Sequence, residues 1–253
     1  MNCHDSFHSI PIKMNKFISR LKYHFQQFFF EYYAVPKVIN EKISKSVLRK
    51  YLPANPVIID CGAHDGADSV ALAKLFKTAA IHAFEPVNAL YARLKHNTKP
   101  YPNINCYPLA LADSDGHMDF YISTGGSDAS SSLLEPKDHL TDHPDTFFAN
   151  KVTVTTRTLD SWVKENNIPK IDMLWLDMQG FELKMLMASS VILETVSVIH
   201  TEVSTRETYK RVAQYQDYRS FLEKKGFTMQ IEAIPAGWDM GNVLFVKNNQ
   251  IQL

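Results

Sequence analysis

The chain has 253 residues, which suffices for one α/β domain with an appendage and is short for two independent domains. Its 27 lysines and arginines balance 27 aspartates and glutamates, so the global charge favours no nucleic-acid partner. The three cysteines, Cys3, Cys61 and Cys106, form neither a zinc motif nor a disulfide framework. We therefore expect a cytoplasmic protein without a bound metal.

Residues 1–50 are expected to form a helical extension ahead of a domain that spans residues 51–253. No apolar stretch approaches the roughly 20 residues that cross a bilayer. Within residues 14–33, one helical face carries Phe17, Leu21, Phe25, Phe28 and Tyr32. Such a face either packs against the domain or a second subunit, or lies on a membrane surface. Packing is favoured because apolar helical stripes usually form core.

From residue 57 onward, strand-like runs alternate with helical runs. Strands are expected over residues 57–60, 80–85, 104–109, 172–178 and 196–203, and helices over 69–76, 88–96, 159–164, 182–187 and 209–225. Residues 118–123 suggest a hairpin strand, residues 124–145 a mobile or ligand-gated loop, and residues 227–234 and 243–246 a closing antiparallel pair. This alternation predicts an α/β, Rossmann-like, doubly wound fold with a mostly parallel sheet.

The sharpest motif follows the first of these strands and reads Ile58-Ile59-Asp60-Cys61-Gly62-Ala63-His64-Asp65-Gly66. In open α/β sheets the ligand lies beyond the carboxyl ends of the strands. The two glycines allow close approach of the backbone, and we expect His64 to shape the loop. The acid at the strand end suits a ligand with a cationic amine or sulfonium and repels a pyrophosphate. The motif therefore disfavours a nicotinamide dinucleotide, which requires G-x-G-x-x-G at this place.

A second acid, Glu85, ends the next strand in the run Ala83-Phe84-Glu85-Pro86. A carboxylate at this position can accept both hydroxyls of an adenosine ribose. The two motifs in this order predict a site for S-adenosylmethionine.

Two later strands deliver further candidates. Asp177 follows an apolar strand in the run 174–182, where it can bind the methionine amine or an acceptor hydroxyl. Glu182 suits either a helix start or a substrate contact. At the end of the next strand, His200 and Glu202 share one face and are candidates for a general base. His200 could equally be a hydrogen-bonded core histidine.

With these motifs the chain resembles the FkbM family of S-adenosylmethionine-dependent methyltransferases over residues 57–246. The resemblance rests on the motifs at residues 60–66, 84–86, 109–113, 125–132 and 177–182. It implies that Leu111, Ala112 and Asp113 border the adenine and that residues 177–182 face the methyl group and acceptor. The family more commonly has Glu where this chain has Gln179, so Gln179 is not assigned as a proton acceptor.

The sequence thus predicts an O-methyltransferase acting on a hydroxyl of a glycan or small metabolite. Cofactor-binding residues are expected to be Asp60, Gly62, Ala63, His64, Gly66, Ser69, Glu85, Pro86, Leu111, Ala112, Asp113 and Asp177. The catalytic candidates are His200, Asp177 and Glu202, and the acceptor candidates are Ser127, Ser130, Ser131, Gln179, Glu182 and Trp238. An alternative is a non-catalytic S-adenosylmethionine-binding module that docks a membrane or partner through its N-terminal helix.

Overall fold

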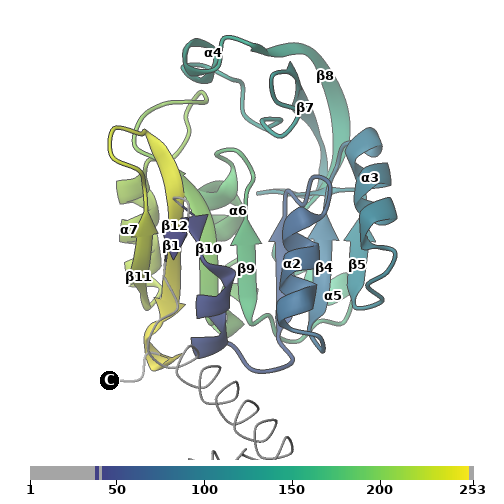
Figure 1. The fold of residues 1–253 in the computed structure, drawn as a ribbon, viewed down its shortest axis with the longest axis vertical. Coiled ribbons are helices and arrows are strands. Elements are labelled where there is room, and N and C mark those ends of the chain that lie inside the picture. The colour runs from purple at the N-terminus through teal and green to yellow at the C-terminus, as the bar shows by residue number, and fades with distance from the viewer. Residues whose placement is uncertain (1–37, 40–41, 251–253) are drawn as a thin grey trace, which may run out of the picture. The chain divides into compact units, whose positions relative to one another are not determined.

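The computed structural model describes residues 38–39 and 42–250 (Figure 1). The compact unit that contains the described residues begins at Val38. The helix expected over residues 14–33, with its membrane or dimer contact, lies outside the described residues. No helix in the described part of the chain has the length and hydropathy to cross a membrane.

The domain is built on a seven-stranded sheet in the order β11-β12-β10-β9-β3-β4-β5. Its strands are β3 (Val57–Cys61), β4 (Ala80–Phe84), β5 (Ile104–Tyr107), β9 (Met173–Leu176), β10 (Val198–Ser204), β11 (Phe227–Ala233) and β12 (Met240–Lys247). The inner strands pair in parallel, and β12 runs antiparallel to both β10 and β11. The predicted Rossmann-like α/β fold is confirmed, including its closing antiparallel pair.

Helices cover both faces of this sheet (Figure 1). One face carries the 3-10 helix η1 (Lys45–Lys50), α2 (Ala67–Leu75) and α3 (Asn88–Thr98), and the other carries α5 (Leu159–Glu165), α6 (Glu182–Ala188) and α7 (Tyr215–Lys224). Because side chains alternate along a strand, Ile58 packs in the core under α2 and Ile59 in the core under α5 and α6. Short 3-10 helices η2 (Ile192–Thr195) and η3 (Asn248–Gln250) complete these layers.

The segment before β3 belongs to the same core. The hairpin β1 (Val38–Ile39) and β2 (Lys42–Ile43) leads into η1, whose Leu48 is fully buried beside Leu72 of α2. The expected boundary at residue 50 therefore falls inside the compact unit, which begins at Val38.

A cap lies beyond the carboxyl ends of the parallel strands (Figure 1). It consists of β6 (Ala110–Leu111), β7 (Gly116–Gly125), the short helix α4 (His139–Asp142) and β8 (Thr146–Arg157), with β8 between β6 and β7. Neither β8 nor α4 was predicted from the sequence. Much of β8 is exposed, so its apolar alternation is weak, although the β-branched run at residues 152–156 is a strand signal.

The predicted start of the helix at Tyr209 is wrong, because α7 begins at Tyr215. Gln214 has an extended backbone. Its backbone amide donates to the Asp217 carboxylate at 2.9 Å, which caps the first turn of the helix. Tyr209 instead lies in the preceding loop with its ring fully buried.

Candidate active site

A cavity lies at the carboxyl ends of β3, β4 and β9, the edge of an open α/β sheet where ligands bind. We call it the inner cavity. Its lining includes six residues predicted to bind cofactor, namely Gly62, His64, Glu85, Pro86, Leu111 and Asp177. The other lining residues are Cys61, Phe84, Leu90, Ala110, Phe120, Asp128, Ala129, Ser131, Leu133, Met178, Gln179 and Phe181.

Gly62 brings two walls of the inner cavity together. Its φ is +78°, and a Cβ at this position would lie 1.9 Å from the carbonyl oxygen of Asp177. Only glycine lets the turn after β3 pass so close to the end of β9. The Asp177 backbone occupies the space that a side chain at residue 62 would need, which places Asp177 beside the turn.

Glu85 is held in a fixed orientation at the end of β4. Its carboxylate accepts the backbone amides of His64 and Val87 at 3.1 and 2.8 Å. Burial raises the pKa of Glu85 from 4.5 to about 7, and the two amides oppose that rise. A carboxylate has further lone pairs, so Glu85 can still accept hydroxyl groups from a ligand in the cavity.

The wall beyond Glu85 is apolar. Pro86, Leu90, Leu111, Phe120 and Leu133 line this part of the cavity. Such a surface suits a flat ring system, whereas the polar end at Gly62 and Asp177 suits charged groups.

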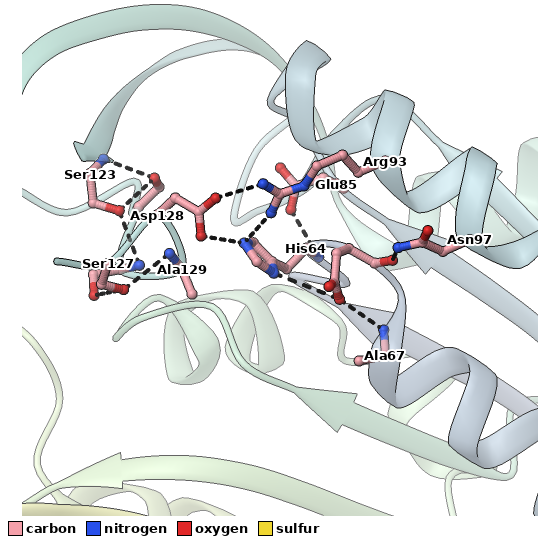
Figure 2. Close-up of polar contacts among 12 residues, drawn as sticks. His64, Ala67, Glu85, Arg93, Asn97, Ser123, Ser127, Asp128 and Ala129 are labelled. Carbon is pink, nitrogen blue, oxygen red and sulfur yellow. Dashed lines mark hydrogen bonds and ion pairs between the residues drawn. The ribbon is translucent and has the colours of Figure 1, made fainter. Parts of the chain in front are cut away.

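One exposed edge of the inner cavity is bridged by charged side chains from three segments (Figure 2). The carboxylate of Asp128, in the loop after β7, lies 2.9 Å from Nε2 of His64 and accepts a hydrogen bond from Arg93 Nη1 at 2.8 Å. Arg93 Nη2 also lies 3.0 Å from His64 Nε2. The bridge joins the cap to the turn after β3 and to α3.

A second, more open pocket adjoins the inner cavity, and we call it the outer pocket. The two share Ala129, Asp177 and Gln179. The outer pocket is also lined by Lys42, Ser130, His139, Asp142, His143, Glu202, Arg206, Thr208, Ala233, Pro235, Gly237, Trp238, Asp239, Met240, Gly241 and Asn242.

Gln179 fixes two carboxyl groups at the junction of these spaces. Its side-chain nitrogen donates to Asp177 Oδ1 at 2.8 Å and to Glu202 Oε2 at 3.0 Å. Its side-chain oxygen lies 3.1 Å from the hydroxyl of Tyr209, whose single hydrogen is shared with the Ser130 carbonyl at 2.8 Å. Both amide hydrogens are therefore used, which defines the orientation of the group.

Glu202 has the electrostatic properties of a proton acceptor. Burial, together with the nearby charges of Asp177 and Glu182, raises its pKa well above the usual value of 4.5. A carboxylate with a raised pKa is a stronger base in its ionised form. Glu202 lines the outer pocket, where an acceptor can reach it.

Glu182 points into the protein and lines neither space. It accepts the backbone amides of Met178 and Gly180 at 2.8 and 3.3 Å, and the hydroxyl of Tyr218 at 2.9 Å. These contacts hold the turn between β9 and α6, so Glu182 orders the turn that carries Gln179.

His200 also lies outside both spaces. Its ring stacks on Trp175 with centroids 3.6 Å apart and planes 2° apart, and burial lowers its pKa to about 3. Glu202 shares its strand face but lies two positions nearer the carboxyl end of β10, where the strand meets the outer pocket. His200 is therefore a core histidine, although its buried Nδ1 has no hydrogen-bond partner in the described part of the chain, and we do not propose it as a base.

Other residues predicted to bind cofactor also lie outside the inner cavity. They are Asp60, Ala63, Gly66, Ser69, Ala112 and Asp113. Asp60 is buried and accepts the Ser69 hydroxyl at 2.5 Å, on the α2 side of the sheet. Gly66 precedes α2 and faces Leu94 of α3, and Asp113 is exposed beyond β6.

The acceptor candidates are distributed over both spaces. Ser131 lines the inner cavity, and Ser130 and Trp238 line the outer pocket. Ser127 lines neither, and its hydroxyl accepts the Ala129 amide at 3.1 Å within the loop.

Asp128, Arg93, Tyr209, Lys42 and Arg206 were not predicted as site residues. Lys42 and Asp128 come from segments distant in sequence from the strand-end motifs, whereas Arg93, Arg206 and Tyr209 lie in the helix or loop that follows such a motif. Of these five residues, Asp128 is the one that the sequence could have indicated, because it is an acid within the serine-rich loop predicted to be mobile or ligand-gated.

The FkbM methyltransferase domain model matches residues 60–229, which include every residue that lines the inner cavity and part of the lining of the outer pocket. The chain belongs to the FkbM methyltransferase family. It is 32% identical over 174 residues to the 2-O-methyltransferase NoeI of Sinorhizobium fredii, covering 67% of this chain and 72% of that protein. It is 26% identical over 227 residues to the methyltransferase sdnD of Sordaria araneosa, covering 78% of this chain and 85% of that protein.

A solved structure with the same fold is the methyltransferase FkbM of Methylobacillus flagellatus. The TM-score is 0.52 at 12% identity, and the match covers 76% of this FkbM-family chain and 44% of that chain. The present chain thus spans less than half of that protein, and the likeness concerns the fold.

The cofactor of the family is S-adenosylmethionine. The residues that line the inner cavity suit this cofactor. The buried carboxylate of Glu85 is fixed beside an apolar wall, and Asp177 lies at the other end of the cavity. Glu85 would hold the ribose, Leu111 with its apolar neighbours would hold the adenine, and Asp177 would face the methionine end.

Proposed function

We propose that this FkbM-family protein is an O-methyltransferase that acts on a hydroxyl of a glycan or small metabolite. The observation that carries the proposal is that Ala129, Asp177 and Gln179 line both the inner cavity and the outer pocket. A hydroxyl held at this junction adjoins the cofactor's space and two carboxyl groups. S-adenosylmethionine, when bound, supplies an electrophilic methyl group.

The protein's own part is to orient the hydroxyl and take its proton. Glu202 is the proposed acceptor of that proton, with Asp177 beside it on the shared amide of Gln179. Fixing both carboxyl groups before the acceptor arrives supports the positioning on which such transfers depend. The Glu202 carboxyl then holds the proton until the product leaves.

The outer pocket supports a sugar-like acceptor. Trp238 lines it with 63% of its surface exposed, and polar groups of Asp142, Arg206 and Asn242 line the same pocket. An exposed aromatic face beside hydrogen-bonding side chains suits the mixed apolar and hydroxyl faces of a sugar. The 2-O-methyltransferase NoeI supports oxygen as the methylated atom. We place the reaction in the cytoplasm, since Cys61 and Cys106 are free thiols.

Cofactor binding is the first test. Wild type should bind S-adenosylhomocysteine at about micromolar Kd by calorimetry, and Glu85→Gln should weaken it about tenfold or more, by loss of charged hydrogen bonds to the ribose. Asp113→Asn is the matched control, because Asp113 lies outside the cavity, and should keep wild-type affinity. Absence of binding by folded wild type would contradict the cofactor assignment.

Methyl transfer is the second part of the same test. Labelled S-adenosylmethionine would be offered with a panel of methyl glycosides and small alcohols. Glu202→Gln should lower kcat about 100-fold, the usual contribution of a general base, and keep its affinity for S-adenosylhomocysteine. Methylation confined to nitrogen or carbon acceptors would overturn the hydroxyl assignment.

A further inference from the structure

The loop at residues 126–131, which we call the serine loop, forms a partition between the inner cavity and the outer pocket. Asp128 and Ser131 line the inner cavity, Ser130 lines the outer pocket, and Ala129 lines both. A displacement of this loop would therefore change both spaces together.

The serine loop is joined internally by its hydroxyl groups. The Ser131 hydroxyl accepts the Ser123 amide at 2.9 Å, and the Ser123 hydroxyl accepts the Ser130 amide at 3.1 Å. The Ser127 hydroxyl accepts the amide of Ala129 and the hydroxyl of Ser130, both at 3.1 Å. These cross-links favour movement of the loop as one unit.

One end of the serine loop is anchored at the proposed proton acceptors. The Tyr209 hydroxyl donates to the Ser130 carbonyl at 2.8 Å, and the Ser132 hydroxyl donates to the Gln179 carbonyl at 2.8 Å. Tyr209 and Ser132 are fully buried, so this anchor is well protected from solvent.

The middle of the loop is held by the charged bridge of Asp128 to His64 and Arg93 (Figure 2), and at its start the Gly126 amide donates to the Asp145 carbonyl at 2.9 Å. The side chains of Asp128 and Arg93 are 49% and 48% exposed. Exposed ion pairs are weak and readily broken. The same bridge reaches the cofactor side, because the His64 amide donates to Glu85 at 3.1 Å.

We propose that Asp128 is a positioning residue that couples cofactor binding to acceptor binding. A cofactor in the inner cavity retains the serine loop against His64 and Arg93, and the retained loop presents Ala129 and Ser130 to the acceptor. By linkage, the acceptor then strengthens cofactor binding by the same factor. The inference rests on the proposed function for its acceptor.

The first arm of the test needs no acceptor. Hydrogen exchange of residues 126–132 would be followed in the full chain, with and without saturating S-adenosylhomocysteine. Wild type should exchange more slowly with the ligand bound, and Asp128→Asn should lose most of this slowing although the ligand is bound. Asp119→Asn is the matched control, since Asp119 pairs with Lys151 elsewhere on β7 and β8, and should behave as wild type.

The second arm uses the methyl glycoside with the highest wild-type turnover. Asp128→Asn should raise the acceptor KM about tenfold, within the usual range of coupling between sites, and lower kcat by a smaller factor. S-adenosylhomocysteine affinity measured with and without that glycoside should differ in wild type and become equal in the variant.

The inference is overturned if the ligand leaves exchange of residues 126–132 unchanged in wild type. It is also overturned if Asp128→Asn weakens S-adenosylhomocysteine alone and leaves the acceptor KM unchanged. If wild type methylates no hydroxyl, the proposed function fails, and the exchange arm still decides whether the cofactor holds the loop.

Discussion

Asp60 illustrates at the residue scale how a strand-end acid can serve the fold. It lies 1% exposed on the α2 side of β3, and burial raises its pKa from 3.8 to about 7. Between about pH 4 and pH 7 the folded chain therefore keeps a proton that the unfolded chain has lost. The free energy of unfolding should fall as pH rises through this window and stay lower above it.

Asp60→Asn should remove this fall in the free energy of unfolding. The neutral amide can still accept the Ser69 hydroxyl, so the variant should be more stable than wild type at pH 8 by about 4 kcal/mol, from a pKa difference of roughly three units. Urea unfolding at pH 5 and pH 8 measures the effect, with exposed Asp119→Asn as control. Equal pH dependence in wild type and Asp60→Asn would contradict the assigned pKa.

The same variant tests whether Asp60 serves the fold or binds the cofactor. Because its side chain lies outside the inner cavity, Asp60→Asn should bind S-adenosylhomocysteine as wild type does. A large loss of affinity in a folded variant would restore Asp60 to the cofactor-binding residues that the sequence predicts.

At the element scale, the site depends on turns that join strands to the cap. In the turn after β9, the Met178 amide donates to the Glu182 carboxylate, and the Gln179 carbonyl accepts the hydroxyl of Ser132 in the cap. The strand ends were predictable, because apolar runs followed by acids mark them. The cap was not predictable from the sequence, because β7 and β8 pair across a long loop and expose many of their residues.

Ser132→Ala tests the contact between the cap and that turn. The Ser132 hydroxyl is buried, donates to the Gln179 carbonyl at 2.8 Å and accepts the Leu134 amide at 2.9 Å. Leaving these two buried groups without a partner should lower the free energy of unfolding by about 1–3 kcal/mol. Urea unfolding would measure it, and exposed Ser114→Ala should change stability little. An unchanged stability for Ser132→Ala would mean that the cap does not depend on this contact.

At the scale of the whole molecule, the compact unit includes residues that the sequence analysis placed in a separate extension. Ile43 and Leu48 are 5% and 0% exposed and pack with α2 and the sheet. Lys42, on the same segment, lines the outer pocket. The segment before residue 51 thus contributes both to the core and to the proposed acceptor site.

Two truncated chains test this boundary. A chain beginning at Val38 retains the whole compact unit and should keep the affinity for S-adenosylhomocysteine. A chain beginning at Tyr51 loses the two buried side chains and should be less stable by about 3 kcal/mol or more. Thermal and urea unfolding compare the two. Equal stability would support a boundary at residue 50.

The sequence alone was enough to predict the α/β architecture, the edge of the sheet that carries the site and the family. Apolar runs followed by Asp60, Glu85 and Asp177 mark strand ends, and the carboxyl ends of parallel strands meet at one edge. Only the tertiary structure decided which of these acids line the inner cavity. Asp60 shares the face of Ile58 and is covered by α2, and His200 stacks on Trp175 of the neighbouring strand. Asp128 reaches the inner cavity through the cap, whose long-range strand pairing local patterns do not encode.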